Sequence, residues 1–192
     1  MKTALWIVGG AIAGAATMLT VGRVRAASMG RKLVDKLRSV LGTPYIWGGS
    51  DPSRGLDCSG AVVWALQQLG LKPKGWDSTA AGLQKQASRV LAPVPGDLAF
   101  YGSSGNVSHV MVYAGAGDVI GATGGGSDTK TVADARARGA EVKVVPVTYR
   151  SDFLGYGRLP VVAAADAVVA GLPPARRGLL TLGRAAITSR PW

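Results

Sequence analysis

The chain contains 192 residues, of which 47% are hydrophobic and 17% are charged, and this composition excludes an intrinsically disordered protein. The length suits one domain of roughly 100–150 residues with extensions. The single cysteine excludes an internal disulfide, and one cysteine with one histidine is too few ligands for a structural zinc site, so we expect no metal and no cofactor. The net charge of +11 favours anionic partners such as membrane head groups or an acidic wall polymer. Nucleic acid is not expected as a partner, because the sequence has no basic stripe with interleaved aromatic residues.

The N-terminal segment, residues 1–25, is predicted to be a hydrophobic anchor or signal helix. Residues 4–22 form a run of 19 residues without a charge. A helix of that length is about 28 Å long, close to the thickness of the bilayer hydrocarbon. An uncleaved membrane anchor and a cleaved export signal both fit this pattern, and Arg25 favours the anchor because it interrupts the small residues needed for cleavage. We therefore expect membrane attachment through residues 4–22, or export to the cell envelope.

The central region, residues 26–160, is predicted to form an α+β domain. Apolar residues spaced by three and four predict helices in its first half, over 31–41, from Cys58 to about Leu69, and over 79–87, with Ser78 as the N-cap of the last. Strand-like runs follow, at 97–101, 109–113, 119–122, 142–147 and 153–159. Helices followed by strands are typical of an α+β fold with an antiparallel sheet. We expect Trp47 and Trp64 in the core of this domain.

Two residues of the central region form a candidate catalytic pair. Cys58 opens a predicted helix, where the positive end of the helix dipole stabilises a thiolate, so we expect the pKa of this thiol to be lowered. His109, the only histidine, begins a predicted strand. A thiol and an imidazole together supply a nucleophile and a general base.

Four stretches of the central region resemble, in order and spacing, the NlpC-type cell-wall peptidases: GTPYIWGG at 42–49, DCSG at 57–60, PGDLAF at 95–100 and SHVMVY at 108–113. The resemblance covers about residues 30–160. It implies a papain-like fold, in which the helix of the nucleophile packs on an antiparallel sheet that carries the histidine. It also implies hydrolysis of amide bonds in peptidoglycan stem peptides.

The resemblance further implies roles for individual residues. Cys58 would be the nucleophile and His109 the base, and the substrate cleft that binds a free peptide amine would include Tyr45, Asp57 and Ser59. One position departs from the family pattern. A third polar residue, often histidine, usually lies 12 positions after the base, and this sequence has Gly121 there. Thr123, on the same face of a regular strand, is the candidate to orient the imidazole instead.

The C-terminal segment, residues 161–192, is predicted to be an Ala/Arg-rich tail outside the resemblance. Its alanines and valines predict a short helix over 161–172, which the prolines at 173 and 174 end. Beyond them, arginines alternate with leucines. This pattern fits a membrane-surface segment, or a tail that packs on the domain or on a partner.

The leading hypothesis is a thiol peptidase of the cell wall, either membrane-anchored or exported. A bacterial envelope protein and a phage virion protein that opens the wall fit the sequence equally, with envelope or virion proteins as partners. The alternative is a catalytically weak or inactive wall-binding or structural module on the same fold, which Gly121 favours. A related acyl-transfer or lipid-acting papain-like enzyme is the third hypothesis.

Overall fold

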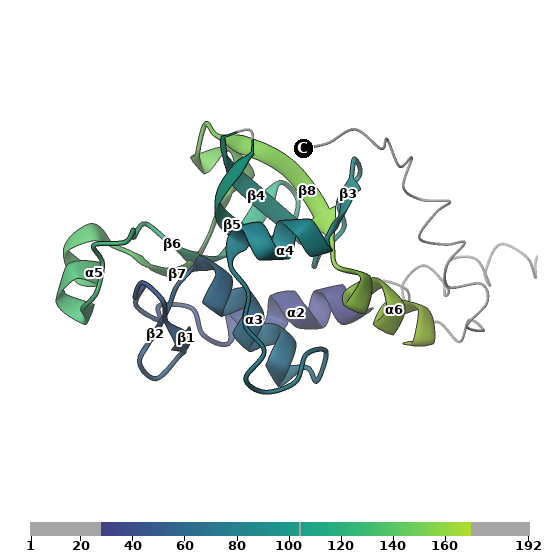
Figure 1. Cartoon of the computed structure of the whole chain (residues 1–192), viewed down its shortest axis with the longest axis horizontal. Helices are drawn as coiled ribbons and strands as arrows, with labels where there is room; N and C mark the ends of the chain where they lie inside the picture. The colour runs from purple at the N-terminus through teal and green to yellow at the C-terminus, as the bar shows by residue number, and fades with distance from the viewer. Residues whose placement is uncertain (1–27, 104, 170–192) are drawn as a thin grey trace, which may run out of the picture.

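A six-stranded antiparallel sheet forms the centre of the computed structural model, which describes residues 28–103 and 105–169 (Figure 1). The strand order is β3-β8-β4-β5-β6-β7. The strands are β3 (Ser88–Val90), β4 (Leu98–Ser103), β5 (Asn106–Gly115), β6 (Asp118–Thr123), β7 (Glu141–Pro146) and β8 (Phe153–Arg158). The predicted α+β class with an antiparallel sheet is therefore confirmed, although the three residues of β3 were not predicted.

The helices are α2 (Ser28–Arg38), α3 (Cys58–Gln68), α4 (Ala80–Gln86), α5 (Val132–Arg138) and α6 (Pro160–Val169), with a 3-10 turn at Val147–Tyr149. The predicted helices at 31–41, 58–69 and 79–87 are confirmed within three residues at each end. The helix expected over 161–172 is present as far as Val169. Among the helices described, none has both the length and the apolar character needed to span a bilayer. The predictions for residues 4–22 and for the tail beyond Val169 lie outside the described residues.

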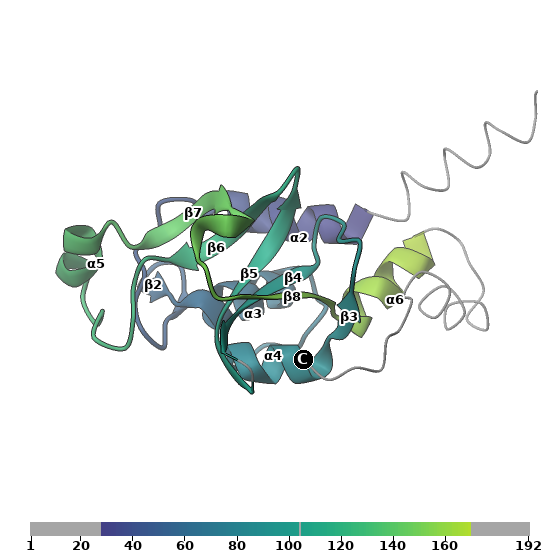
Figure 2. The same cartoon turned by 90° about the horizontal axis from the view of Figure 1, so that it is seen from above.

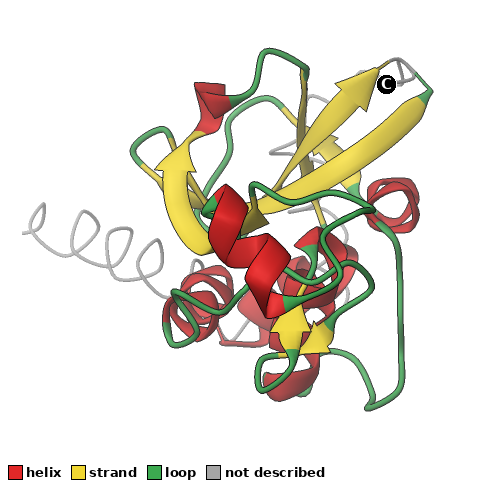
Figure 3. Cartoon of the chain, turned by 90° about the vertical axis from the view of Figure 1, so that its left-hand side faces the viewer, coloured by secondary structure: helices red, strands yellow, loops and turns green. Residues whose placement is uncertain are grey.

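The two faces of the sheet have different neighbours because side chains alternate along each strand. One face, which includes Leu98, Phe100, Val110 and Val112, forms the main hydrophobic core with α2, α3 and α4. Figure 3 shows the strands curving over these helices. The opposite face carries a smaller cluster of Ala99, Tyr101, Met111 and Val119. His109 lies on this second face, two residues before Met111.

Helix α3 begins at Cys58 because Asp57 caps it. Asp57 has extended backbone, and its Oδ1 accepts a hydrogen bond from the backbone N–H of Gly60 at 2.7 Å. The buried side of the helix includes Val62 and Leu66, which are fully covered by the core. Aspartate at the N-cap therefore fixes which residue stands at the positive end of the helix.

The N-cap of α4 differs from the prediction. Thr79, not Ser78, caps the helix, and its Oγ1 accepts from the backbone N–H of Gly82 at 3.1 Å. The backbone N–H of Ser78 instead donates to Asp77 Oδ1 at 2.7 Å. The predicted boundary was therefore wrong by one residue, because Thr79 and not Ser78 accepts the free N–H of the first turn.

Helix α6 closes the domain against α2. The carboxylate of Asp166 accepts a hydrogen bond from the backbone N–H of Met29 at 2.6 Å, so a residue of the last helix caps the first turn of α2. Figure 2 shows the two helices next to each other at one end of the molecule.

Arg158 of β8 forms a bidentate ion pair with the buried carboxylate of Asp97, at 2.6 and 2.7 Å. Asp97 Oδ2 also accepts from the backbone N–H of Val94 at 2.7 Å.

A small hairpin and a loop carry the residues around the site. The hairpin consists of β1 (Ser50–Asp51) and β2 (Gly55–Leu56), which are paired antiparallel. The loop 124–131 leads into α5, whose N-cap Thr131 forms a capping box with Asp134. The segment just before the hairpin is joined to this loop by a hydrogen bond from the backbone N–H of Trp47 to the carbonyl of Thr129 at 2.8 Å.

Candidate active site

Cys58 lies at the first position of α3, beside a cavity of about 440 Å³. The cavity is lined by Cys58, Ser59 and Gly60, by the segment 47–50, and by residues of α4 and β5. The thiol is the only part of the chain in this cavity that can act as a strong nucleophile, and 6% of the residue remains exposed. The cavity therefore offers a covered place where a substrate carbonyl could meet the sulfur.

The electrostatics of the thiol differ from the sequence-based expectation. The pKa of Cys58 is raised to about 11, mainly by burial and also by the neighbouring Asp57 carboxylate. The backbone N–H groups of Val110, Ser59 and Cys58 itself act in the opposite direction. The predicted lowering of this pKa was wrong because burial and the capping carboxylate outweigh the N–H groups at the helix end.

His109 is 5% exposed and lies among aromatic rings. Its imidazole centroid is 5.8 Å from that of Tyr101 and 6.3 Å from that of Tyr149. The pKa of His109 is lowered to about 4, mainly by burial and also by the Arg150 guanidinium, while Asp152 acts in the opposite direction. The imidazole is therefore neutral at pH 7, and within the described residues its buried Nε2 has no hydrogen-bond partner.

Helix α3 and strand β5 bring the candidate nucleophile and base to the same part of the fold. The backbone N–H of Val110, the residue directly after His109, lies close enough to the Cys58 thiol to act on its pKa, which it lowers. Tyr149, whose ring packs edge-on against His109, also has its pKa raised, and the charge of Cys58 contributes to that shift. The arrangement supplies a neutral thiol at the start of α3 and a neutral imidazole one residue before Val110 on β5.

Asp57 links the nucleophile helix to the wall of the cavity. Its Oδ1 accepts from Gly60 N–H and from Ser59 Oγ, at 2.7 and 3.1 Å, and its Oδ2 accepts from Gly48 N–H at 2.9 Å. Its backbone N–H donates to the carbonyl of Gly49 at 2.9 Å. Since each carboxylate oxygen has two lone pairs, Oδ2 retains one acceptor position for a further donor.

Tyr45 lies next to the thiol but is 2% exposed. Burial raises its pKa well above the ordinary value, with further contributions from Cys58 and Asp57. Its ring also contacts the backbone of the 124–131 loop, because a Cβ on Gly125 would overlap it. The hydroxyl consequently stays protonated and is a donor at neutral pH.

The position opposite His109 on β6 is occupied by Thr123. Continuing the register of β5 and β6 from the pair Val112–Ile120 places Thr123 across from His109. The Thr123 hydroxyl, however, donates to Tyr149 Oη at 3.1 Å. Gly121 lies beside Met111, where a Cβ would be 3.5 Å from the Met111 side chain. That Thr123 orients the imidazole stays a prediction. The contacts observed between them are indirect, because Thr123 is hydrogen-bonded to Tyr149 and the ring of Tyr149 packs against His109.

Sequence reasoning did not identify several residues around these side chains. Tyr149 ends the 3-10 turn, and Arg150 and Asp152 follow it. All three approach His109 only because β7 and β8 flank the central strands. Trp47 was expected in the core and is instead 52% exposed, whereas Trp64 packs against the core as predicted. The hydrogen bond that fixes the Trp47 backbone holds this residue where the hairpin meets the loop, at the edge of the cavity.

No group of three or more His, Cys, Asp or Glu side chains that could hold a metal ion is found in residues 28–103 and 105–169. The chemistry that the described side chains offer is nucleophilic attack by sulfur, with imidazole as the base.

Known proteins share this fold and these motifs. Residues 42–144 match the model of the NlpC/P60 family. Protein P54 of Enterococcus faecium is 39% identical over 104 residues, which cover 53% of this chain and 19% of that protein. A bifunctional muramidase/DL-endopeptidase of Bacillus subtilis is 35% identical over 96 residues, covering 47% of this chain and 29% of the relative. The chain thus spans less than a third of the length of these relatives.

Solved structures give the same assignment. The crystal structure of the NlpC/p60 domain of the peptidoglycan hydrolase SagA is 29% identical and has a TM-score of 0.51. The match covers 68% of this chain and 98% of that domain. The family model covers more than half of the chain and includes both Cys58 and His109, and the resemblance seen in the sequence is confirmed. The chain belongs to the NlpC/P60 family.

Proposed function

We propose that this protein is a cysteine peptidase that hydrolyses amide bonds in the stem peptides of peptidoglycan. Cys58 is the nucleophile and His109 the general base. The observation that carries the proposal is the position of Cys58 at the first residue of α3, beside a cavity that is also lined by Val107 and Ser108, the two residues of β5 directly before His109. Membership of a family whose relatives include a DL-endopeptidase supports this activity.

The two shifted pKa values determine the order of proton transfer. Between about pH 4 and pH 11 the resting pair is a thiol and a neutral imidazole. His109 therefore accepts the thiol proton as the sulfur attacks the carbonyl carbon, and the N–H groups at the start of α3 stabilise the developing oxyanion. The imidazolium then protonates the leaving amine, and a thioester remains. Water attacks the thioester with His109 again as the base, which releases the carboxylic acid and restores the thiol.

Recognition of the substrate involves the residues beside the thiol. The remaining lone pair of Asp57 Oδ2 suits a free peptide ammonium group, and Ser59 and the protonated Tyr45 hydroxyl add polar contacts. A substrate in the wall requires a location in the cell envelope or on a particle that enters it, and residues 4–22 would supply membrane attachment.

The test is digestion of purified peptidoglycan with mass analysis of the released fragments. Cys58→Ala is expected to lower fragment release by roughly 10³-fold or more, because no other group can form the thioester. Far-UV circular dichroism of the variant should match the wild type. If Cys58→Ala released stem-peptide fragments at the wild-type rate, the assignment of the nucleophile would be wrong.

A second candidate function is a wall-binding module without significant catalysis. The unpartnered Nε2 of His109 and the glycine at position 121 favour it, since no hydrogen bond at Nε2 then fixes the imidazole tautomer within the described residues. The same assay separates the two functions. A binding module sediments with peptidoglycan and releases no fragments, whereas the peptidase releases fragments that depend on Cys58.

A further inference from the structure

A second cavity adjoins the candidate active site. It has a volume of about 490 Å³ and lies between the β1–β2 hairpin and the start of α5. The segment 47–50 lines both cavities. An extended peptide with one amide bond at Cys58 could therefore continue past this segment into the second cavity.

The walls of this second cavity are held in place by backbone hydrogen bonds. Trp47 N–H donates to the carbonyl of Thr129, a residue that is fully buried. The backbone N–H groups of Lys130 and Thr131 donate to the Asp134 carboxylate, at 3.1 and 2.9 Å. On the other side, the Arg54 N–H donates to the carbonyl of Asp51 at 3.0 Å. The backbones that carry the side chains of the cavity are thus fixed before any ligand binds.

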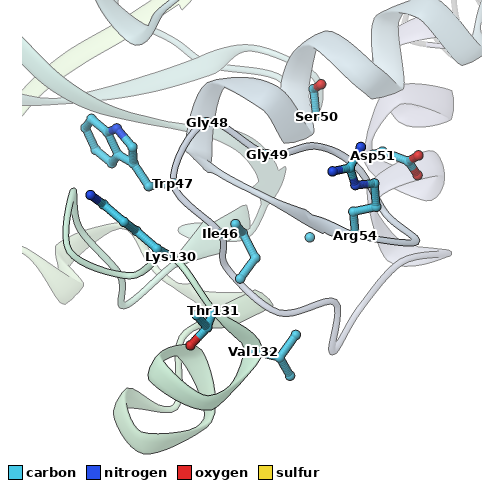
Figure 4. Close-up of a pocket in the computed structure, with 11 residues that line it drawn as sticks. Ile46, Trp47, Gly48, Gly49, Ser50, Asp51, Arg54, Lys130, Thr131 and Val132 are labelled. Atoms are coloured by element: carbon cyan, nitrogen blue, oxygen red, sulfur yellow. The ribbon is translucent and has the colours of Figure 1, made fainter.

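The charge of the cavity is positive. In Figure 4, Lys130 lies with Trp47 on one side of the cavity, and Arg54 lies on the other. Asp51, the single acidic residue of the lining, accepts hydrogen bonds from the N–H and Oγ of Ser53, both at 2.9 Å. Within the described part of the chain, neither Lys130 nor Arg54 forms a close ion pair, and the charge of Arg54 is the smallest of the causes that lower the pKa of Asp51. The two cations are consequently available to an anionic ligand.

We propose that this cavity binds a carboxylate-bearing portion of the peptide substrate, with Arg54 and Lys130 as its cationic walls and Trp47 as an apolar contact. The proposal rests on the proposed peptidase function, because continuity with the first cavity is what links the ligand to the peptide. Arginine and lysine are the side chains that pair with carboxylates, and the exposed indole offers a flat surface to the aliphatic part of the ligand.

The test uses the full chain and two synthetic stem peptides that differ only in carrying a free carboxylate or a carboxamide. We expect the wild type to have a KM for the carboxylate peptide that is lower by roughly three- to tenfold, the range for partly exposed charge pairs. Arg54→Gln with Lys130→Gln should raise this KM to the value for the carboxamide peptide and leave kcat close to that of the wild type. The control is Lys32→Gln, an exposed lysine on α2 that lines neither cavity, and it should retain the full preference.

A binding measurement separates failure of this proposal from failure of the peptidase function. Titration of both peptides into Cys58→Ala, with and without the two glutamine substitutions, reports on the cavity without catalysis. A carboxylate preference that is lost in the glutamine variant supports the cavity even if neither peptide is hydrolysed. Equal affinity for the two peptides, or a preference that survives the glutamine substitutions, overturns it. So does binding of a neutral saccharide that depends on Trp47 and not on the two cations.

Discussion

Gly60 illustrates how a missing side chain shapes the site. A Cβ at this position would overlap the carbonyl oxygen of Gly49, so only glycine lets the first turn of α3 touch the segment 47–50. The Gly60 N–H donates to Asp57, which in turn holds Gly48. Steric fit therefore explains the glycine of the DCSG motif. Without a side chain, it lets the segment 47–50, which lines both cavities, pack against the helix of the nucleophile.

The first residue-scale prediction concerns the reactivity of Cys58 toward iodoacetamide. The thiol has a pKa raised to about 11, and the neutral imidazole, whose pKa is lowered to about 4, gives no positive charge to a thiolate. The thiolate fraction, and with it the alkylation rate, should therefore rise about tenfold for each pH unit between pH 6 and pH 9. Mass spectrometry of labelled protein over this range measures the rate.

The matched control is His109→Ala, which should leave the slope of this pH dependence unchanged. A rate that is already at a plateau below pH 8, and that falls when His109 is removed, would show a thiolate–imidazolium pair in the resting protein and contradict the prediction.

The second residue-scale prediction concerns Gly121. A Cβ there makes an ordinary contact with the Met111 side chain, so Gly121→Ala should fold normally. Gly121→His places an acceptor diagonally across from His109 and should raise the hydrolysis rate by roughly tenfold, part of what an orienting group contributes in related triads. Steady-state hydrolysis of a stem peptide, compared between the histidine and alanine variants, measures the gain.

If Gly121→His folds normally and gains nothing over Gly121→Ala, the imidazole is already oriented by another group. The pair of Thr123 and Tyr149 is then the candidate, and Thr123→Val should lower the rate because it releases the Tyr149 hydroxyl.

At the scale of elements, α2 depends on α6 for its cap. The described residues of α2 bring no acidic side chain to its first turn, and the Met29 N–H instead finds Asp166. Asp166→Ala should lower the free energy of unfolding by about 1–2 kcal/mol, the ordinary cost of losing a helix cap. Urea denaturation followed by circular dichroism measures it.

Asp35→Ala is the control on the same helix, because the Asp35 carboxylate is exposed and pairs only with Arg38 at 3.5 Å. Its effect should stay within about 0.5 kcal/mol. Equal losses for the two variants would contradict the assigned role of Asp166.

Long periodic elements were predictable from the sequence, whereas short ones were not. The apolar spacing of α3 and the short apolar runs of β4 and β5 are local signals, and the structure contains these elements within three residues of the predicted limits. The β1–β2 hairpin has two residues in each strand, too few for any periodicity. Helix α5 is similarly short, although Thr131 and Asp134 have the spacing of a capping box and could have indicated it.

The same distinction applies to the candidate site. Cys58, Asp57 and Ser59 are neighbours in sequence, so their pattern was sufficient to single them out. Tyr149, by contrast, lies beside His109 only because of the order of the strands in the sheet. Lys130 lies near Trp47 because a backbone hydrogen bond joins Trp47 to Thr129, in another loop. The pKa of Cys58 was mispredicted for the same reason, since its burial depends on strands that follow much later in the chain.

At the scale of the whole molecule, the hydrogen bond between Met29 and Asp166 means that the first and last helices of the described residues meet. The described part of the chain thus forms a loop whose two ends are in contact. A short covalent bridge between residues at these two positions would close this loop without moving any strand. It would also reduce the entropy of the unfolded chain. In the chain-entropy model this raises the free energy of unfolding by roughly 5 kcal/mol for a loop of this size. Residues 28–169 are for the same reason suited to insertion into a surface loop of another protein, because a host loop would need to open by little more than the spacing of two packed helices.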